Sequence, residues 1–433
     1  MTLDVLTFGT PLHQTGKPDS MACDFFYPNM GGVENHLYNL SQCMLKRGHK
    51  VVIITHAYGD RNGVRWLSGG LKVYYMPIPV MFNQVTFPTI FSTLPLIRSV
   101  LIRERITHLH GHQVLMSARV VICRPFLQFV TKQYFIPEPW GFPLLKFTLS
   151  DVDSVICVSN TSKENTVLRA ALDPERVFVI PNAVLSEQFT PDPSKRDPDH
   201  STQIGLKGVD LLLAVIPRIC AAFPKVRFLI AGDGPKKVDL EQLCDEHLLH
   251  NQVNLIGAVA SEEAQNIMVR GHIFLNTSLT EAFCMAIIEA ASCGLFVVST
   301  KVGGVPEVLP SDMIELAMPE EDHLTETLAK VIIDMEAGRI DTSTFHDRVA
   351  RMYSWQDVAQ RTEDIYFAAH KQPRDSTVIH RMAEYYGSGP VLGKIACVLV
   401  MIDFLLFAFL DWLVPRSSID VAPDFPYDAY YKL

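Results

Sequence analysis

Short apolar runs alternate with amphipathic stretches through most of the chain, and this alternation constrains the fold more than any other feature. Strands of a parallel sheet are buried on both faces and appear as continuous apolar runs, separated by crossover helices. The runs expected to form strands are Val51–Thr55, Leu71–Met76, Ser154–Ser159, Val177–Ile180, Arg227–Ala231, Val253–Ile256, Ile273–Asn276 and Phe296–Ser299. The pattern predicts an α/β fold built from doubly wound sheets.

The amphipathic stretches between these runs are the predicted helices. They are Val33–Arg47, Asp210–Phe223, Asp239–His247, Ala282–Cys293, His323–Ala337 and Trp355–His370. A polar, proline-bearing run, Thr190–Ser201, follows Pro181-Asn182 and separates two halves of similar size. We expect Rossmann-like domains over residues 1–181 and 182–372, with the last helix crossing back onto the first. Two such domains facing a cleft bind ligands beyond the carboxyl ends of their strands.

Composition narrows the classes of function. A net charge of −9 leaves no basic face to neutralise phosphates, which argues against nucleic acid. The nine cysteines show no paired spacing, as is typical of a reducing compartment. Met1–Ala22 holds no apolar run long enough for a signal peptide, so we expect the bulk of the chain in the cytosol.

Near the C-terminus, Val391–Leu413 is apolar over a length that can span a bilayer. A charged residue, Asp403, lies at its centre and costs about 2.5–3.5 kcal/mol. The Leu, Ile, Phe and Val residues between Ile395 and Leu410 return roughly 3–6 kcal/mol on the same scale. We therefore predict a transmembrane helix over residues 391–413, with a buried helix as the alternative. An intramembrane Asp usually faces a partner, so Asp403 predicts contact with another membrane subunit.

Charge around this segment predicts its orientation. Arg374 and Arg381 precede it and Lys394 lies at its start, whereas only Arg416 follows closely. Basic residues favour the cytosolic side of a membrane. We expect residues 373–390 to be a cytosolic linker and residues 414–433 to be a lumenal or external tail.

The segment Asn276–Glu289 carries the clearest chemistry. A strand ends at Asn276, a polar loop follows, and a helix is predicted to begin near Ala282 or Phe283. Backbone N–H groups at that helix start, those of Phe283, Cys284 and Met285, can hold a diphosphate without a metal. Glu289, within the helix, can accept both hydrogen bonds of a ribose diol, and Glu281 lies where a sugar would sit. The apolar residues between the two glutamates favour an inward-facing pair over ordinary surface charge.

Glu281 and Glu289 match the E-x7-E motif of family four glycosyltransferases, which have the GT-B fold. Five segments are similar to the PIG-A family of phosphatidylinositol N-acetylglucosaminyltransferase subunits: Asp24–Glu34, Arg47–Tyr58, Ser162–Leu172, Gly271–Ala291 and Val297–Pro310. The resemblance implies retaining, metal-independent transfer of GlcNAc from UDP-GlcNAc to phosphatidylinositol, the first step of GPI-anchor synthesis. It also implies the cytosolic face of the endoplasmic reticulum, partner membrane subunits and no cofactor. The alternative is a non-catalytic or splice-altered relative that only assembles with the complex.

The resemblance assigns further donor-site residues. Lys207 resembles the lysine that neutralises the leaving diphosphate, the largest electrostatic help such a leaving group can receive. Gly232 and Gly234 resemble the G-x-G-P loop beside the uracil. Gly31 and Gly32 lie ahead of a helix, where backbone without Cβ can approach a phosphate or sugar, although a plain tight turn fits equally well.

Asn182 also matches a family position, with a capping turn as the alternative. His110 and His112 lie at a predicted strand end and are candidate sugar or phosphate contacts. With His108 they alternate on one strand face, but no fourth ligand is evident and no metal is expected. Asp151 and Asp153 have a D-x-D spacing, but they precede a strand, which favours surface charge over a metal site.

Three segments depart from the family. Lys17–Ser20 interrupts the expected first strand, and Met1–Gly16 has no counterpart. Arg119–Phe142 lacks the segment whose histidine faces the donor sugar. Between Thr190 and Lys207 only Ile204 and Leu206 are apolar, so we expect the first strand of the second domain, and its diphosphate-binding arginine, to be absent.

Overall fold

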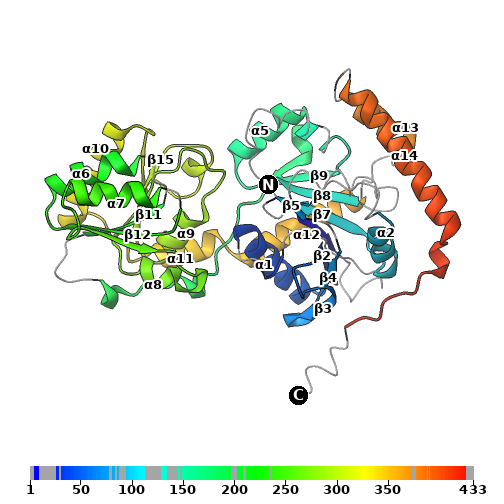
Figure 1. Ribbon diagram of the computed structural model, residues 1–433, viewed down its shortest axis with the longest axis horizontal. Coiled ribbons are helices and arrows are strands. Elements are labelled where there is room, and N and C mark those ends of the chain that lie inside the picture. Colours follow the sequence, from blue (N-terminus) through cyan, green and yellow to red (C-terminus); the bar gives the residue numbers. More distant parts are fainter. Residues whose placement is uncertain are drawn as a thin grey trace, which may run out of the picture. The chain divides into compact units, whose positions relative to one another are not determined.

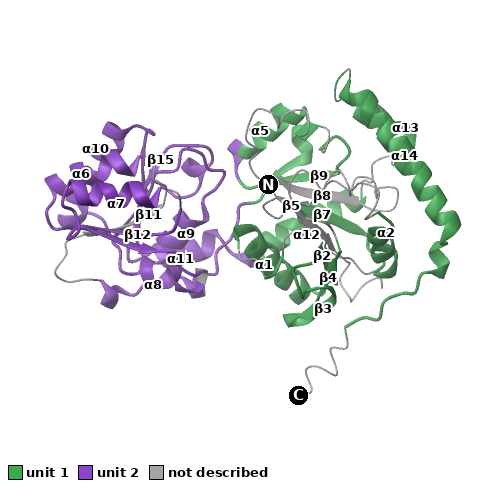
Figure 2. Cartoon of the chain, in the orientation of Figure 1, with its two compact units in different colours: residues 1–158, 162–180, 356–433 green, residues 159–161, 181–355 purple. Residues whose placement is uncertain are grey.

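A computed structural model describes most of the chain. The described residues are 4–8, 26–28, 31–77, 80–82, 85–86, 94–112, 128–133, 145–146, 149–196, 202–207, 211–234, 236–371, 377–387, 389 and 391–425. They form two compact units (Figure 2). Unit 1 comprises residues 1–158, 162–180 and 356–433, and unit 2 comprises residues 159–161 and 181–355.

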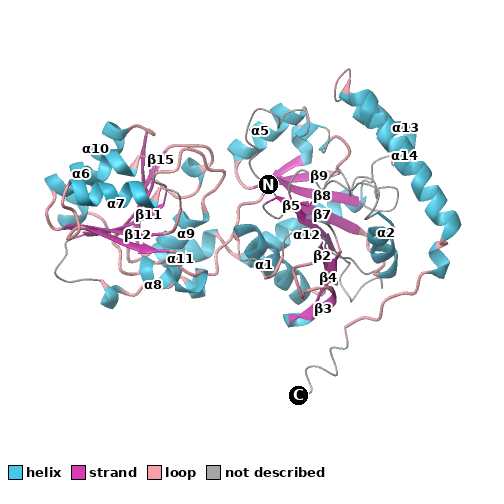
Figure 3. Cartoon of the chain, in the orientation of Figure 1, coloured by secondary structure: helices cyan, strands magenta, loops and turns pink. Residues whose placement is uncertain are grey.

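Unit 2 is a parallel six-stranded sheet between two layers of helices. The strands are ordered β13-β12-β11-β14-β15-β16. Their bounds are β11 Thr202–Lys207, β12 Val226–Ala231, β13 Val253–Gly257, β14 Ile273–Asn276, β15 Phe296–Thr300 and β16 Ile314–Ala317. The helices are α6 Leu212–Ala222, α7 Lys237–Glu246, α8 Ala264–Met268, α9 Met285–Ser292, α10 Glu321–Glu336 and α11 Phe345–Met352. Helices α6, α7 and α10 lie on one face of the sheet, and α8, α9 and α11 lie on the other (Figures 1 and 3).

The strand predicted to be absent is present. Thr202–Lys207 forms β11, which pairs in parallel with β12 on one side and β14 on the other. Ile204 stands opposite Phe228 and Ile273 in these ladders. The prediction was wrong because a short strand between two neighbours gains main-chain hydrogen bonds on both edges. Two apolar residues are then enough for it to form.

Unit 1 is a mixed eight-stranded sheet with the order β10-β9-β8-β7-β1-β2-β4-β3. Its strands are β1 Asp4–Phe8, β2 Val51–His56, β3 Gly63–Leu67, β4 Leu71–Met76, β7 His108–His112, β8 Gln128–Gln133, β9 Ser154–Cys157 and β10 Val177–Val179. A separate two-stranded ribbon pairs β5 Val80–Phe82 with β6 Val85–Thr86. The helices are α1 Gly32–Lys46, α2 Leu94–Arg103, α5 Asn160–Ala170, α12 Trp355–Lys371, α13 Val378–Tyr386 and α14 Leu392–Leu413.

The centre of the unit 1 sheet is built from part of Met1–Gly16, for which the sequence predicted no family counterpart. Asp4–Phe8 forms β1, which lies between β2 and β7 and runs antiparallel to both. Residues 9–25, with the expected interruption at Lys17–Ser20, lie outside the described residues, as does most of Arg119–Phe142. The sheet is therefore mixed where a wholly parallel one was expected.

The apolar C-terminal helix α14 has two different faces. One stripe, repeating every three or four residues, is buried against unit 1: Gly393, Ala396, Val400, Asp403, Phe407 and Leu410. Ala396, Val400 and Phe407 join the core cluster that also holds Leu94, Ile97 and Tyr385. The opposite face leaves large apolar side chains exposed, among them Val398, Leu405, Phe409 and Trp412. Among the described residues, α14 is the one helix long and apolar enough to cross a membrane.

Asp403 does not face outward. Its side chain is 3% exposed and lies on the stripe that packs against unit 1. Contact of Asp403 with another membrane subunit stays a prediction, and it requires α14 to leave unit 1. The chain's own unit 1 covers this carboxylate.

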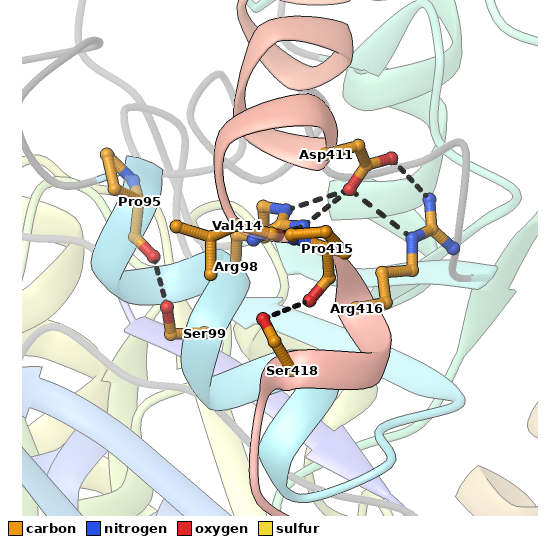
Figure 4. Close-up of polar contacts among 8 residues, drawn as sticks. All are labelled: Pro95, Arg98, Ser99, Asp411, Val414, Pro415, Arg416 and Ser418. Atoms are coloured by element: carbon orange, nitrogen blue, oxygen red, sulfur yellow. Dashed lines mark hydrogen bonds and ion pairs between the residues drawn. The ribbon is translucent and has the colours of Figure 1, made fainter.

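Polar contacts fasten the end of α14 to α2 (Figure 4). Arg98, which is 4% exposed, lies 2.5 Å from Asp411 and also donates to the carbonyl of Val414 at 2.8 Å. Arg416 approaches the other oxygen of Asp411 at 3.1 Å. Beyond the helix, the N–H of Ala422 donates to the carbonyl of Arg103 at 2.9 Å. The tail as far as residue 425 therefore runs along unit 1.

Candidate active site

The carboxyl edge of the unit 2 sheet aligns residues at the ends of three neighbouring strands. Lys207, the last residue of β11, pairs with Asn276, the last residue of β14, and Asn276 pairs with Ser299 of β15. This is the edge at which parallel sheets bind ligands. The structure therefore places the backbone of the predicted lysine directly beside the start of the Asn276–Glu289 segment.

A chain of side-chain hydrogen bonds leads from the buried sheet to Glu281. Asn276 and Ser299 are fully buried, and the Asn276 amide donates to the Ser299 hydroxyl at 2.9 Å. The Ser278 hydroxyl lies 2.8 Å from the side-chain oxygen of Asn276 and 3.2 Å from Oε1 of Glu281. Thr300 donates to the carbonyl of Ser278 at 2.6 Å. The loop that carries Glu281 is thus anchored to two strands.

Helix α9 begins at Met285, three residues later than the earlier of the two predicted starts. Cys284 precedes it in the left-handed conformation, with φ of 58° and ψ of 87°. A residue with Cβ rarely adopts this conformation, and strain of this kind clusters at functional sites. The left-handed residue separates Ala282–Phe283 from the helix, so Glu281 lies in the loop and not on the helix. The first N–H groups of any α-helix have no acceptor within it, which makes this end suited to an anion.

Glu289 lies just over one turn inside α9 and is partly exposed. It is close enough to Cys293 to influence that buried thiol. Burial and the Glu289 charge together raise the pKa of Cys293 to about 12. The thiol therefore stays protonated at neutral pH, and the negative charge on this part of the helix belongs to Glu289.

Two glycines that the sequence reasoning did not single out as site residues support the Glu281 loop. The N–H of Gly304 donates to the carbonyl of Glu281 at 3.1 Å. A Cβ on Gly303 would overlap that carbonyl oxygen, and one on Gly304 would overlap the carbonyl oxygen of Ala282. Gly303 also has a φ of +51°. Their signal in the sequence was a Gly-Gly pair that begins three residues after the end of β15.

The glycines predicted to lie beside the uracil follow β12 at the same edge of the sheet. Gly232 has a φ of +144°, which favours glycine, and its N–H donates to the carbonyl of Gly257 at 2.7 Å. A Cβ on Gly232 or Gly234 would meet nothing within 4 Å among the described residues. The loop is therefore fixed at Gly232 by a main-chain hydrogen bond, and the space around both glycines is open.

The remaining candidates lie elsewhere. Gly31 and Gly32 begin α1 in unit 1, and Gly31 is the N-terminal cap residue in extended conformation. Asn182 is buried in unit 2, at 8% exposed. His112 ends β7, but its side chain lies outside the described part of the structure. The roles predicted for these residues stay predictions.

His110 lies in the core of unit 1. It is fully buried, and its Nδ1 is hydrogen-bonded to the hydroxyl of Tyr366 on α12. His108 stacks on the same tyrosine, with ring centroids 5.6 Å apart. His108 and His110 therefore share one face, which packs under a helix. Burial of this kind does not support a sugar or phosphate contact for His110.

The described residues contain no group of three or more His, Cys, Asp or Glu side chains that could hold a metal. The first aspartate of the D-x-D segment is not the surface charge that was predicted. Asp151 is fully buried and lies 2.7 Å from Arg381 of α13. A cavity of about 730 Å³ in unit 2 lies at the opposite end of the sheet, beside Arg227 and Val253 at the starts of β12 and β13. It is separate from the carboxyl edge.

Comparison with known proteins matches this geometry. Residues 204–341 match the family model of group 1 glycosyl transferases, and residues 56–125 match the PIGA model of GPI anchor biosynthesis. The phosphatidylinositol N-acetylglucosaminyltransferase gpi3 subunit of Schizosaccharomyces pombe is 49% identical over 93% of this chain and 92% of its own. The corresponding protein from Homo sapiens, also named as part of this transferase, is 47% identical over 93% of this chain and 87% of its own.

Solved structures share the fold at low sequence identity. A sucrose-phosphate synthase from Thermosynechococcus elongatus is 18% identical, with a TM-score of 0.66 over 79% of this chain and 94% of its own. Anabaena Alr3699/HepE, solved in complex with UDP, is 17% identical, with a TM-score of 0.64 over 79% of this chain and 99% of its own. These likenesses support the two-domain GT-B architecture predicted from the sequence.

Proposed function

Since this chain belongs to the PIG-A family of phosphatidylinositol N-acetylglucosaminyltransferase subunits, we propose that it transfers GlcNAc from UDP-GlcNAc to phosphatidylinositol. It is a glycosyltransferase with a GT-B fold. The observation that carries the proposal is the network from Asn276 through Ser278 to Glu281, next to the N-terminus of α9. It supports a prepared donor site, and nothing in it favours the non-catalytic alternative.

The proposed roles follow the geometry of the carboxyl edge. Glu289 binds the ribose hydroxyls, and the N–H groups around Phe283, Cys284 and Met285 bind the diphosphate. Lys207 neutralises the charge that develops on the diphosphate as the bond from the anomeric carbon to phosphate oxygen breaks. That bond's electron pair leaves with UDP. An inositol hydroxyl forms the new bond to the anomeric carbon, and its proton passes to the departing UDP.

Glu281 lies where the transferred sugar is expected and holds its hydroxyl groups. We propose that the anomeric configuration is retained and that no metal or other cofactor takes part. The helix N-terminus and Lys207 then supply the positive charge that a metal would otherwise provide.

The lipid acceptor and the apolar helix suggest where the reaction takes place. Helix α14 has 22 residues, enough to cover about 33 Å at 1.5 Å per residue, against a hydrocarbon core of about 30 Å. We propose a single-pass protein of the endoplasmic reticulum, with both α/β units in the cytosol and with partner membrane subunits. Spanning requires the buried stripe of α14 to leave unit 1, with loss of the Arg98–Asp411 contact.

The test is transfer of radiolabelled GlcNAc from UDP-GlcNAc to phosphatidylinositol by membranes that contain the chain with its partner subunits. Glu289→Ala is expected to abolish transfer and to weaken UDP binding measured by calorimetry. The matched control is Glu336→Ala, at the exposed end of α10, which should transfer like the wild type. Wild-type chain that binds no UDP and transfers no sugar in the assembled complex would overturn the proposal.

A further inference from the structure

The carboxylate of Glu307 makes four hydrogen bonds to one short segment of unit 2. Oε2 accepts from the backbone N–H of Asn160 at 2.6 Å and from its side-chain amide at 2.8 Å. Oε1 accepts from the backbone N–H of Thr161 at 2.8 Å and from its hydroxyl at 2.7 Å. Asn160 and Thr161 directly follow Ser159, and all three residues belong to unit 2.

The charge state of Glu307 suits this contact. Partial burial alone would raise its pKa, but the hydrogen bonds from Thr161 and Asn160 outweigh burial and lower the pKa below the ordinary glutamate value. Glu307 is therefore ionised at neutral pH. A carboxylate that accepts several N–H and O–H bonds forms shorter and stronger bonds than a neutral amide in the same place.

The residue just before this segment packs on the glycine turn that supports the donor loop. Ser159 is 2% exposed, and its Oγ and Cβ lie so close to Gly304 that a Cβ there would meet both. On its other side Gly304 meets the backbone of Glu281 and Ala282. Gly304 is thus held between Ser159 and the Glu281 loop. Glu307 follows one 3-10 turn later, and its N–H donates to the carbonyl of Gly304 at 3.1 Å.

We propose that Glu307 is a positioning residue for sugar transfer: by holding Asn160 and Thr161 it keeps Ser159 against Gly304, and Gly304 keeps Glu281 in place. Glu307 acts through Glu281 and touches no substrate. Glu289 lies on α9, outside this chain of contacts. Loss of Glu307 should therefore disturb the sugar end of the donor site and leave nucleotide binding intact. This inference rests on the role proposed above for Glu281.

Kinetics of Glu307→Ala and Glu307→Gln test the proposal. A shift of the reacting groups by a fraction of an ångström lowers kcat by about tenfold or more. We expect that loss for Glu307→Ala, a smaller loss for Glu307→Gln, and UDP affinity within about twofold of wild type. The matched control is Glu315→Ala, which removes a carboxylate on β16 that is paired with Lys330 of α10 in the same unit, and this variant should keep wild-type kcat.

A double mutant separates positioning from a general loss of structure. If Glu307 acts through Glu281, Glu281→Gln/Glu307→Ala should be no slower than Glu281→Gln alone, because the second change has no further target. Losses that multiply, a fall in UDP affinity that matches the fall in kcat, or kcat of Glu307→Ala equal to that of Glu315→Ala would each overturn the proposal.

Amide hydrogen exchange tests the same chain of contacts without any activity. The N–H of Gly304, bonded to the Glu281 carbonyl, should exchange faster in Glu307→Ala, while amides in the middle of α9 keep their wild-type rates. Unchanged exchange at Gly304 would refute the positioning role even if the enzyme is active. Faster exchange there with no transfer by wild type would instead count against the proposed function.

Discussion

Arg381 of α13 donates through Nε to Asp151 at 2.7 Å, and both side chains are almost completely buried. The pair joins the segment that precedes α14 to the segment that precedes β9, 230 residues earlier. The carboxylate of Asp403 is also near enough to Arg381 to interact with it electrostatically. The buried guanidinium of Arg381 therefore interacts with a carboxylate on α14 and with a carboxylate just before β9.

Removal of one member of this pair should destabilise unit 1 strongly. A buried charge that loses its partner costs about 3–5 kcal/mol. We expect that loss for Arg381→Ala, measured by denaturant unfolding of the purified chain in detergent. Arg339→Ala, at an exposed pair with Asp334, should cost less than about 1 kcal/mol. Equal losses of unfolding free energy for the two variants would show that the buried pair stabilises unit 1 no more than an exposed pair does.

His272, directly before β14, should make the stability of unit 2 depend on pH. Burial, and to a smaller extent the charge of Arg196, lower its pKa from 6.5 to about 4. Between about pH 4 and pH 6.5, His272 is protonated in the unfolded chain but neutral in the folded chain. Stability is then highest above about pH 6.5 and falls as the pH drops toward 4.

The measurement is chemical unfolding of the wild type and of His272→Gln between pH 7.5 and 4.5. The difference in unfolding free energy between the two should shift in favour of the variant as the pH falls. His250→Gln serves as the control, because His250 is an exposed residue paired with Asp245. A difference between wild type and His272→Gln that stays constant with pH would contradict the prediction.

The strands that consist of continuous apolar runs were predicted best from the sequence. Leu71–Met76 and Ile273–Asn276 form strands with the predicted bounds, because each is a buried apolar run. β11 was missed because its stability comes from two neighbouring strands, which no local count of apolar residues includes. β1 was missed for the same reason: Asp4–Phe8 becomes central through its pairing with β2 and β7.

The site was predictable where chemistry and local structure coincide. Glu281 lies in the loop that follows β14, and Glu289 lies about one turn into α9. Both therefore lie near the carboxyl edge of the sheet, as their spacing in the sequence predicts. Gly303, Gly304 and Glu307 were not predicted as site residues because their roles depend on contacts with Ser159 and Glu281, distant in sequence. His110 was expected at a strand end, but it is the middle residue of β7 and is buried beneath α12, which its sequence neighbours do not reveal.

Gly303→Ala should reduce transfer far more than glycine strain alone explains. Gly303 has a φ of +51°, and a Cβ there would overlap the carbonyl oxygen of Glu281. Displacement of that loop by about 1 Å lowers the rate roughly a hundredfold. Gly59 has a φ of +50° but open space around it, so Gly59→Ala carries the same backbone strain without the collision. Equal kcat values for Gly303→Ala and Gly59→Ala would contradict the prediction that a Cβ at Gly303 displaces the Glu281 loop.

The side of the membrane on which the tail lies distinguishes two states of α14. As a single-pass helix it places residues 414–433 in the lumen, about 30 Å from the cytosolic units. In the structure, by contrast, Asp424 lies 3.0 Å from Lys50, and Ala422 bonds to Arg103. These contacts form only while α14 lies along unit 1.

We expect that an N-glycosylation acceptor sequence added after Leu433 is modified in microsomes, and that the same sequence inserted after Gly59, in an exposed turn of unit 1, is not. A cysteine in place of Ser418 should then resist a membrane-impermeant maleimide until the microsomes are opened with detergent. Rapid labelling of Ser418→Cys in sealed microsomes, with no glycosylation at the added site, would mean that α14 lies along unit 1 on the cytosolic surface. Its exposed apolar face, with Val398, Leu405, Phe409 and Trp412, would then be the part that meets lipid.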